Sequence, residues 1–425
     1  MLDAEGASRS ERRAKLSGTR TQACFLLNIT LTAPRRPRPD EQGREGREAD
    51  APPFFLSHPP MKQTPLHDSH EALGARMIEF GGWRMPVQYG PILEEVRHVR
   101  ERVGLFDLGH MGRVAIVGPD ALRFIDHIAT NHCAPIPEGS IRYALFCRED
   151  GNPIDDLLVY REPESVYLVI NAANADADLA WMREHTGELD VVIDDQTATT
   201  TMIALQGPRS AEVLAAVCAD GDIAGLGYYK FTSATVCGVE GTRVSRTGYT
   251  GEVGYEIYLQ NDAAGGVWEG LLAANAEVRP IGLAARDTLR LEAGMALYGH
   301  EIDAAHNPVE ADLSFAISFS EEKGDWIGRD ALQTVARAPR RKLVGLTTGG
   351  KRVPRQGYGL YRGDEPVGEI CSGAVSPTLD TNIATAYVPP ELAEPGTELE
   401  MDIRGRRQPV TLCALPFYSR TRPKN

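Results

Sequence analysis

The chain has 425 residues with a formal net charge of −14, and 42% of its residues are hydrophobic and 24% charged. This length allows two or three domains, each with its own core, and the acidic balance argues against a nucleic-acid partner, because phosphate binding needs a basic surface. No apolar run approaches the roughly 18 to 20 residues needed to span a bilayer, which argues against a membrane protein.

Cysteine and histidine spacing gives no sign of a metal centre. The seven cysteines are scattered and never stand in C-x-x-C spacing, and the ten histidines lack a spacing such as H-E-x-x-H. Zinc sites use such short spacings, and disulfide frameworks pair even numbers of cysteines in small secreted domains. We therefore predict a reducing compartment, no disulfide framework and no metal.

Residues 1–60 differ from everything after them. They are rich in Arg, Pro, Gly and Glu and carry little periodic apolar content, which predicts an unstructured extension. An Arg-rich start is typical of an organelle transit peptide, but Asp3, Glu5 and Glu11 fall where such peptides avoid acids. A start codon placed too early is the simpler account, with Met61 as the natural first residue. We expect a cytoplasmic protein, or one of the mitochondrial matrix if the extension is a transit peptide.

From residue 61 onward, helical and strand signals mix without a regular βαβ rhythm, which argues against a doubly wound sheet. Apolar periodicity and terminal residues define the first expected elements. They are a helix at 94–100 that stops at Gly104, a strand at 113–117 before a Gly-Pro turn, a helix at 120–128 capped by Asp120, a strand at 166–170 and a helix at 174–185.

Two adjacent carboxylates open another expected strand, just after a Gly-Asn-Pro turn. Because side chains alternate along a strand, Asp155 and Asp156 point to opposite faces. Asp156 shares its face with three apolar positions, Ile154, Leu158 and Tyr160. Burying a carboxylate without partners costs several kcal/mol, so such an acid is hydrogen-bonded by its surroundings or kept for a ligand. The spacing leaves open whether Asp155 caps the turn and Asp156 is a satisfied structural acid.

A glycine-rich turn and a strand occupy residues 246–257 and carry Glu256. The turn lacks the G-x-x-x-x-G-K-[ST] order of a phosphate loop, so its glycines are expected to allow a tight turn or a close approach of the backbone. Glu256 stands between Tyr255 and Ile257 in a strand otherwise suited to burial. Ordinary alternation toward solvent explains it; a buried ligand-binding acid is the alternative.

Residues 282–294 predict a helix closed by a glycine. Arg286 and Arg290 lie four residues apart and share a face of this helix. An exposed face of salt bridges is the usual explanation for such charges. The neighbouring leucines leave little polar surface, however, so we expect at least one arginine to point inward toward an acid or a ligand.

The order of elements predicts an α+β fold in three parts. Residues 202–208 repeat the strand and Gly-Pro turn of residues 113–119, which indicates two related α+β units within residues 61–335. After residue 340 the signals change to short strands between Gly and Pro, typical of a small antiparallel barrel over residues 340–420. These strands are expected at 343–346, 367–370, 384–388, 398–403 and 408–412.

The sequence has no Ser or Cys nucleophile motif and no dinucleotide G-x-G-x-x-G at a strand-helix junction. We therefore consider a pocket for a polar heterocycle, lined by Asp156, Glu256 and an arginine. Tyr143 and Tyr160 are available to stack or to form hydrogen bonds there. Catalysis in such a pocket would rest on positioning and carboxylate electrostatics.

Many short motifs follow one another in order from about residue 64 to residue 418, nearly the whole chain after Met61. They are Thr64-Pro65-Leu66, Phe80-Gly81-Gly82-Trp83, Met85-Pro86, Gly104-Leu105-Phe106-Asp107, His110-Met111-Gly112, Ile154-Asp155-Asp156-Leu157, Leu205-Gln206-Gly207-Pro208, Arg246-Thr247-Gly248-Tyr249-Thr250-Gly251-Glu252, Ala285-Arg286-Asp287, Leu291-Glu292-Ala293-Gly294 and Pro308-Val309-Glu310. Together they resemble the aminomethyltransferase family, the T proteins of the glycine cleavage system. Residues 1–60 match nothing in it.

The resemblance implies a three-domain ring, in which two α+β units surround a central folate site next to a C-terminal β-barrel. It implies an enzyme that takes an aminomethyl group from the lipoyl arm of H protein, releases ammonia and forms 5,10-methylenetetrahydrofolate. Tetrahydrofolate is then the acceptor substrate. The lipoylated H protein is the partner, with a functional link to the P and L proteins, and no metal, nucleic acid or membrane is required.

The resemblance also assigns residues. Asp156 matches the family's catalytic aspartate, which holds the attacking folate nitrogen and stabilises positive charge on the transferred carbon. Glu256 matches the acid that binds the guanidine-like edge of the pteridine through two parallel hydrogen bonds, and Arg286 matches a folate-contacting arginine. Further positions that the resemblance places at the ligand are Tyr143, Tyr160, Met111, Asn171 and Tyr418.

Other folate-dependent proteins share the implied fold. A tetrahydrofolate-dependent demethylase of a small methylated or sulfonium substrate is the nearest alternative enzyme. Fused sarcosine and dimethylglycine dehydrogenases are disfavoured because their flavin-binding domain has no counterpart here. A folate-binding accessory protein of iron-sulfur maintenance is expected to carry a Lys-Gly-Cys-Tyr type motif, where this chain has Arg246-Thr247-Gly248-Tyr249. A purely structural role would leave the paired acids without a purpose.

Overall fold

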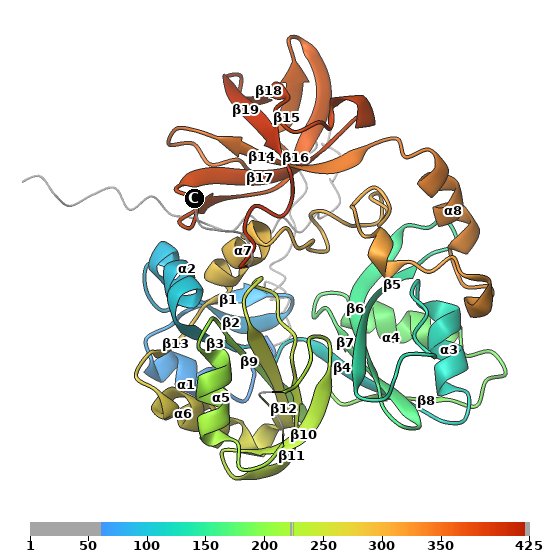
Figure 1. Cartoon of the computed structure of the whole chain (residues 1–425), viewed down its shortest axis with the longest axis vertical. Coiled ribbons are helices and arrows are strands. Elements are labelled where there is room, and N and C mark those ends of the chain that lie inside the picture. Colours follow the sequence, from blue (N-terminus) through green and yellow to red (C-terminus); the bar gives the residue numbers. More distant parts are fainter. Residues whose placement is uncertain (1–60, 222, 224, 421–425) are drawn as a thin grey trace, which may run out of the picture. The chain divides into compact units, whose positions relative to one another are not determined.

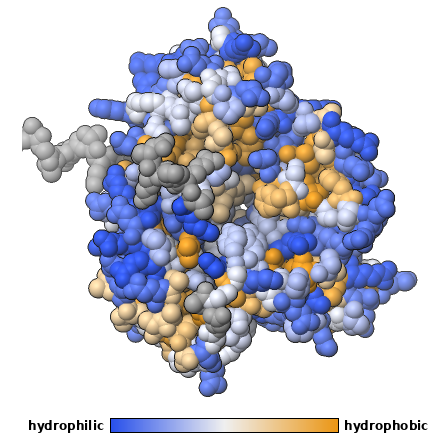
Figure 2. Space-filling view, viewed as in Figure 1, coloured by the Kyte–Doolittle hydropathy of each residue, from blue (hydrophilic) through white to orange (hydrophobic). Residues whose placement is uncertain are grey.

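The computed structural model describes residues 61–420 except 222 and 224. The extension predicted at residues 1–60 lies outside the described residues, so that expectation stays a prediction. No helix in the described part is long and apolar enough to cross a membrane. Hydrophilic residues cover most of the face shown in Figure 2, with smaller apolar areas between them.

The first α+β unit is built on a five-stranded sheet with the order β5-β6-β7-β4-β8. Its strands are β4 (Gly112–Val117), β5 (Ser140–Cys147), β6 (Pro153–Arg161), β7 (Ser165–Ile170) and β8 (Val192–Asp195). Helices α3 (Ala121–Ile128) and α4 (Ala175–Glu184) share one apolar cluster with alternate residues of the sheet, such as Leu157 and Val159. The strands expected at 113–117 and 166–170 and the helices expected at 120–128 and 174–185 are thus confirmed.

The second unit is a six-stranded sheet with the order β10-β11-β12-β9-β3-β13. Its elements are β3 (Val103–Asp107), β9 (Thr200–Gln206), β10 (Phe231–Val236), β11 (Val239–Ser245), β12 (Gly254–Gln260), β13 (Val278–Pro280) and the helices α5 (Ser210–Val217) and α6 (Ala264–Ala274). Its first four strands occupy the same order relative to the chain as β5-β6-β7-β4 of the first sheet. Because both β4 and β9 lead through Gly-Pro into a helix, the structure supports the two related units that the sequence indicated.

Two predicted helix ends are wrong in detail. Asp120 stands before α3 but makes no capping bond to it; its Oδ2 accepts instead from the Asp190 backbone N–H, at 3.0 Å. Helix α2 (Ile92–Glu101) ends before Gly104, which lies inside β3. A Cβ on Gly104 would come within 2.6 Å of Ile281 Cγ1, so this glycine permits close packing rather than ending a helix.

The C-terminal strands close into the barrel β14-β17-β16-β15-β18-β19, as predicted. They are β14 (Lys342–Thr348), β15 (Gly359–Arg362), β16 (Glu365–Ser376), β17 (Thr381–Val388), β18 (Glu398–Asp402) and β19 (Arg407–Cys413). The short strand β15 was missed, because only Leu360 of its four residues is buried and four residues give little periodicity. Helix α8 (Arg329–Arg337) precedes the barrel.

Two apolar clusters and helix α7 (Leu283–Glu292) link the two sheets and the barrel, whose strands are labelled in Figure 1. An apolar cluster joins the two sheets through residues such as Tyr160 of β6 and Tyr258 of β12. A second cluster joins β5 to the barrel through Leu145 and Leu343. Helix α7 packs on α2, β16 and β17 and on β2 (Trp83–Gln88), which pairs with β1 (Arg76–Phe80) after α1 (His67–Ala72). The α+β class with a C-terminal barrel is therefore confirmed.

Arg290 joins α7 to the barrel. Its side chain is fully buried, and its guanidinium donates to Glu301 Oε2 at 2.9 Å, to Asp287 Oδ1 at 3.0 Å and to Ser372 Oγ of β16 at 2.8 Å. Burial disfavours a charge that lacks a counter-charge. The neighbouring carboxylates compensate for it, so that the pKa of Arg290 lies above its usual value.

Arg290→Met is expected to lower the free energy of unfolding by about 3 to 5 kcal/mol, because it leaves the buried Glu301 carboxylate uncompensated. Chemical denaturation at pH 7 measures this. Arg337→Met, at an exposed position of α8, is the control and is expected to change stability by less than about 0.5 kcal/mol. Equal effects of the two substitutions would contradict the structural role of Arg290.

Candidate functional site

Asp156 is held by two hydrogen bonds on β6. Tyr143 O–H donates to Asp156 Oδ2, and Asn171 Nδ2 donates to Oδ1, both at 2.9 Å. The residue keeps part of its surface exposed, although protein surrounds its carboxyl group. Burial, followed by the charge of Asp155, raises the pKa of Asp156 to about 7. This carboxyl group can therefore change its protonation state near neutral pH.

Asp155 is the more deeply buried acid, and the reading of it as a turn cap is wrong. Within the turn, Asp150 Oδ1 accepts from the Asn152 backbone N–H at 2.9 Å. Asp155 is 0% exposed and accepts from Asn171 N at 2.9 Å, from Asn171 Nδ2 at 2.8 Å and from Asn174 Nδ2 at 2.7 Å. The opposite faces predicted for the two acids are confirmed, since Asp155 lies among the fully buried alternate positions of β6.

Glu256 is 3% exposed on β12, so the solvent-facing reading is wrong. Its Oε2 accepts from Thr247 Oγ1 at 2.5 Å and from Tyr258 O–H at 3.3 Å. The Tyr258 hydroxyl lies 2.6 Å from that of Tyr160, which is itself fully buried. Tyr160 is therefore connected to Glu256 through the Tyr258 hydroxyl. Burial raises the pKa of Glu256, while Thr247 and Arg286 oppose the rise.

The expectation that an arginine of α7 points inward is confirmed. Arg290 is the fully buried one, and its bonds are internal. Arg286 differs, because its Nη1 is buried without a hydrogen-bond partner among the described residues. Its guanidinium lies 4.8 Å from the centre of the Tyr249 ring. An unbonded N–H at a buried position is costly, so Arg286 is suited to receive an acceptor from a ligand.

Tyr229 and Tyr249 interact with these charged groups. The sequence did not single out either tyrosine as a ligand contact. The pKa of Tyr229 is raised by burial and further by the charges of Glu256 and Asp156. The pKa of Tyr249 is raised by burial and by Asp156, and lowered by Arg286. Asp156, Glu256 and Arg286 therefore share one electrostatic environment. The backbone of Tyr229 is also unusual, because it has a left-handed φ of 59°. Non-glycine residues rarely adopt this conformation outside constrained sites.

Phe315 was also missed. It is 69% exposed, and its ring stacks on Tyr143 at 5.7 Å with an interplanar angle of 28°. It lies in the short helix η2 (Ser314–Ala316), within a segment that carries no regular periodicity. Its contact with Tyr143, the hydrogen-bond partner of Asp156, puts an exposed aromatic ring beside the candidate site.

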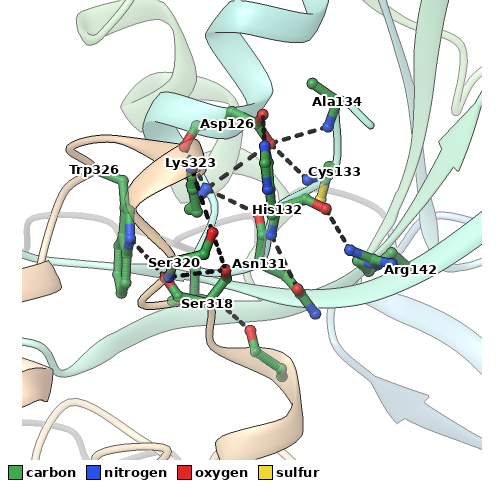
Figure 3. Close-up of polar contacts among 12 residues, drawn as sticks. Asp126, Asn131, His132, Cys133, Ala134, Arg142, Ser318, Ser320, Lys323 and Trp326 are labelled. Atoms are coloured by element: carbon green, nitrogen blue, oxygen red, sulfur yellow. Dashed lines mark hydrogen bonds and ion pairs between the residues drawn. The ribbon is translucent and has the colours of Figure 1, made fainter. Parts of the chain in front are cut away.

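Lys323 links the segment that carries Phe315 to the C-terminal end of helix α3. In Figure 3, Lys323 points to the end of α3, where its Nζ donates to the Asp126 carbonyl at 2.6 Å and to the Asn131 carbonyl at 2.9 Å. Asn131 Nδ2 in turn donates to the carbonyl of Tyr143 at 2.9 Å and to that of Phe315 at 3.4 Å. Burial lowers the pKa of Lys323 to about 8.

The remaining predicted positions separate into two groups. Asn171 bridges the two aspartates, and Met111 packs at the edge of the cluster that contains Tyr160. Tyr418 contacts other groups: its ring lies 4.0 Å from the Arg100 guanidinium, and its N–H donates to the Glu292 carbonyl at 2.7 Å. The described contacts do not link Tyr418 to Asp156 or Glu256. Within the described residues, no group of three or more His, Cys, Asp or Glu could hold a metal ion.

Comparisons with known proteins agree on one family. The model of the GCVT N-terminal domain matches residues 66–321, and that of the glycine cleavage T-protein C-terminal barrel domain matches residues 341–419. The chain is 46% identical to the aminomethyltransferase of Symbiobacterium thermophilum over 84% of this chain and 97% of that relative. It is 44% identical to that of Streptomyces coelicolor over 86% of this chain and 100% of that relative.

A solved structure gives the same result. The glycine cleavage system aminomethyltransferase T from Bartonella henselae is similar with a TM-score of 0.79 and 34% identity, over 84% of this chain and 98% of that one. The two family models together cover most of the chain, and the curated relatives are matched along nearly their whole length. The chain is therefore a transferase that belongs to the aminomethyltransferase family, the T proteins of the glycine cleavage system.

Proposed function

We propose that this enzyme transfers the aminomethyl group carried by the lipoyl arm of H protein to tetrahydrofolate, with release of ammonia. The aminomethyl carbon exchanges its bonds to sulfur and to the amine nitrogen for bonds to two folate nitrogens. The two protons lost by the folate end on the leaving amine and on the lipoyl sulfur. The products are 5,10-methylenetetrahydrofolate, ammonia and the dihydrolipoyl arm.

The observation that carries the proposal is the shared environment of Asp156, Glu256 and Arg286. A reduced pteridine presents neighbouring N–H donors on one edge and a carbonyl acceptor beside them. The buried Glu256 carboxylate suits the donors, and the unbonded Nη1 of Arg286 suits an acceptor. Both hydrogen bonds described for the Glu256 carboxylate fall on Oε2. The residues present therefore fit tetrahydrofolate as the acceptor substrate.

Asp156 takes the catalytic role in this proposal. Its carboxylate accepts a hydrogen bond from the attacking nitrogen and orients it. Its negative charge stabilises the positive charge that develops on the transferred carbon, within surroundings where burial strengthens electrostatic interactions. Tyr143 and Asn171 fix both oxygens at 2.9 Å, so the carboxylate does not need to reorganise during transfer.

Single-turnover mixing of the purified chain with aminomethyl-loaded H protein and tetrahydrofolate tests the function. Ammonia and methylenetetrahydrofolate are followed together. Both products are expected only when all three components are present. Folate binding without either product would overturn the proposal and favour a tetrahydrofolate-dependent demethylase that uses another donor.

A further inference from the structure

A third aspartate lies behind the candidate catalytic pair. Asp178 belongs to α4, which packs on β6, and its side chain is 0% exposed. Both of its carboxyl oxygens are buried, and no N–H or O–H donor of the described residues reaches them. A buried carboxylate without donors is costly, so its state requires an explanation.

The explanation lies with Asp155, whose carboxyl group is close enough to that of Asp178 for the two to share a hydrogen bond. Two carboxyl groups can share a hydrogen bond only when one of them carries a proton. Asp155 already accepts three N–H donors from Asn171 and Asn174, which suit an anion. Burial raises the pKa of Asp155 as well, but its three N–H donors and Asp178 oppose that rise. Burial together with the charge of Asp155 raises the pKa of Asp178 to about 10, and no described neighbour of Asp178 opposes this rise, so the proton belongs to Asp178.

Few other charges act on this group. From β6, the charges of Asp155 and Asp156 act on Asp178. The charges of Asp155, Arg148 and Asp178 also act on the Tyr298 hydroxyl, which comes from the loop after α7. Further charged residues of α4 and β8 are exposed to solvent, namely Asp176, Arg183, Glu184, Asp194 and Asp195.

We propose that Asp178 is a positioning residue for Asp156: as a neutral acid it donates a hydrogen bond to Asp155 and keeps that carboxylate ionised. Asn171 transmits the arrangement, since its Nδ2 lies 2.8 Å from Asp155 Oδ1 and 2.9 Å from Asp156 Oδ1. The ionised Asp155 then keeps a negative charge beside Asp156, and this charge raises the affinity of Asp156 for a proton. This inference rests on the catalytic role proposed for Asp156.

The first test measures stability and needs no activity. Above the ordinary aspartate pKa, unfolding of the wild type releases the proton of Asp178, so its stability is lost progressively as pH rises from about 4 toward 10. Asp178→Asn keeps a donor for Asp155 and has no such proton. Its melting temperature, relative to wild type, is expected to rise steadily from pH 5 to pH 9. Asp176→Asn, exposed on the same helix, is the control and is expected to show no trend.

A difference between Asp178→Asn and wild type that stays flat from pH 5 to pH 9 would show that Asp178 is ionised when folded, and would overturn the inference. The trend itself is the readout, so a constant cost of the substitution does not obscure it. If no variant turns over, wild type included, the proposed function fails while this series still reports the protonation of Asp178.

The second test addresses positioning through the pH dependence of turnover. Asp178→Asn is expected to stay within about twofold of wild type with the same midpoint. Asp178→Ala removes one of the four donors to Asp155, so the proton affinity of Asp155 rises and its negative charge acts less strongly on Asp156. The midpoint of the acid limb is then expected to move to lower pH by about half a unit or more. An unmoved midpoint in the Ala variant would mean that Asp178 is neutral but does not position Asp156.

Discussion

Asp156→Asn is expected to lower single-turnover transfer of the aminomethyl group by roughly 10² to 10⁴-fold, the range that loss of a positioned acid, base or electrostatic group produces. Asn keeps the shape of the side chain and one acceptor for Tyr143 O–H, but it lacks the negative charge. Affinity for tetrahydrofolate is expected to change little, because Glu256 and Arg286 remain. Rapid mixing with quantified methylenetetrahydrofolate measures the rate.

Glu149→Gln is the matched control, because Glu149 is an exposed acid in the turn before the same strand. Its rate is expected to equal that of wild type. Turnover of Asp156→Asn within a few-fold of the control would remove Asp156 from the mechanism.

The wild-type rate is expected to rise with pH through about 7, since the ionised form of Asp156 is the one that accepts the hydrogen bond and its pKa is raised to about 7. A raised pKa in the folded state also means that ionisation costs stability, which is lost as pH rises from the unfolded value near 4 to about 7. Asp156→Asn is therefore expected to lose this acid limb and to be more stable than wild type at pH 8. Rate and melting temperature, each followed from pH 5.5 to pH 9, check both statements.

Glu256→Gln is expected to weaken binding of tetrahydrofolate by about 10- to 100-fold, as loss of a charge-assisted hydrogen bond of about 1.5 to 3 kcal/mol implies. Gln retains an acceptor for Thr247 and Tyr258 but presents no carboxylate to a pteridine edge, and it leaves Arg286 without its nearby counter-charge. Anaerobic calorimetry with the reduced folate gives the dissociation constant directly.

Glu240→Gln, at an exposed position of the neighbouring strand β11, is the control for removing a carboxylate from this sheet. It is expected to bind folate like wild type. A dissociation constant of Glu256→Gln that matches the control, in a variant with an unchanged melting temperature, would exclude Glu256 from the pocket.

Much of the fold followed from local pattern, because apolar residues repeat with different periods in helices and strands. The strand at 113–117, the helix at 174–185 and five barrel strands were predicted in this way. The errors arose at residues whose type is compatible with two structural roles. Gly104 can end a helix or admit a neighbouring side chain, and only the packing of Ile281 against β3 distinguishes these. Asp120 can cap a helix or bind a distant backbone N–H, as it does at Asp190.

The sequence by itself determined the family of this protein, the order of its elements and the placement of Asp156 and Glu256 on strands and of Arg286 on a helix, because strand alternation and ordered motifs are local properties of the chain. The tertiary structure decided which acids are buried and which arginine of α7 keeps a buried nitrogen without a hydrogen-bond partner among the described residues. Asp155 and Asp178 lie 23 residues apart in the sequence, and only the packing of α4 on β6 puts them in contact. Protonation depends on such long-range neighbours and on burial, which is why spacing alone could not assign it.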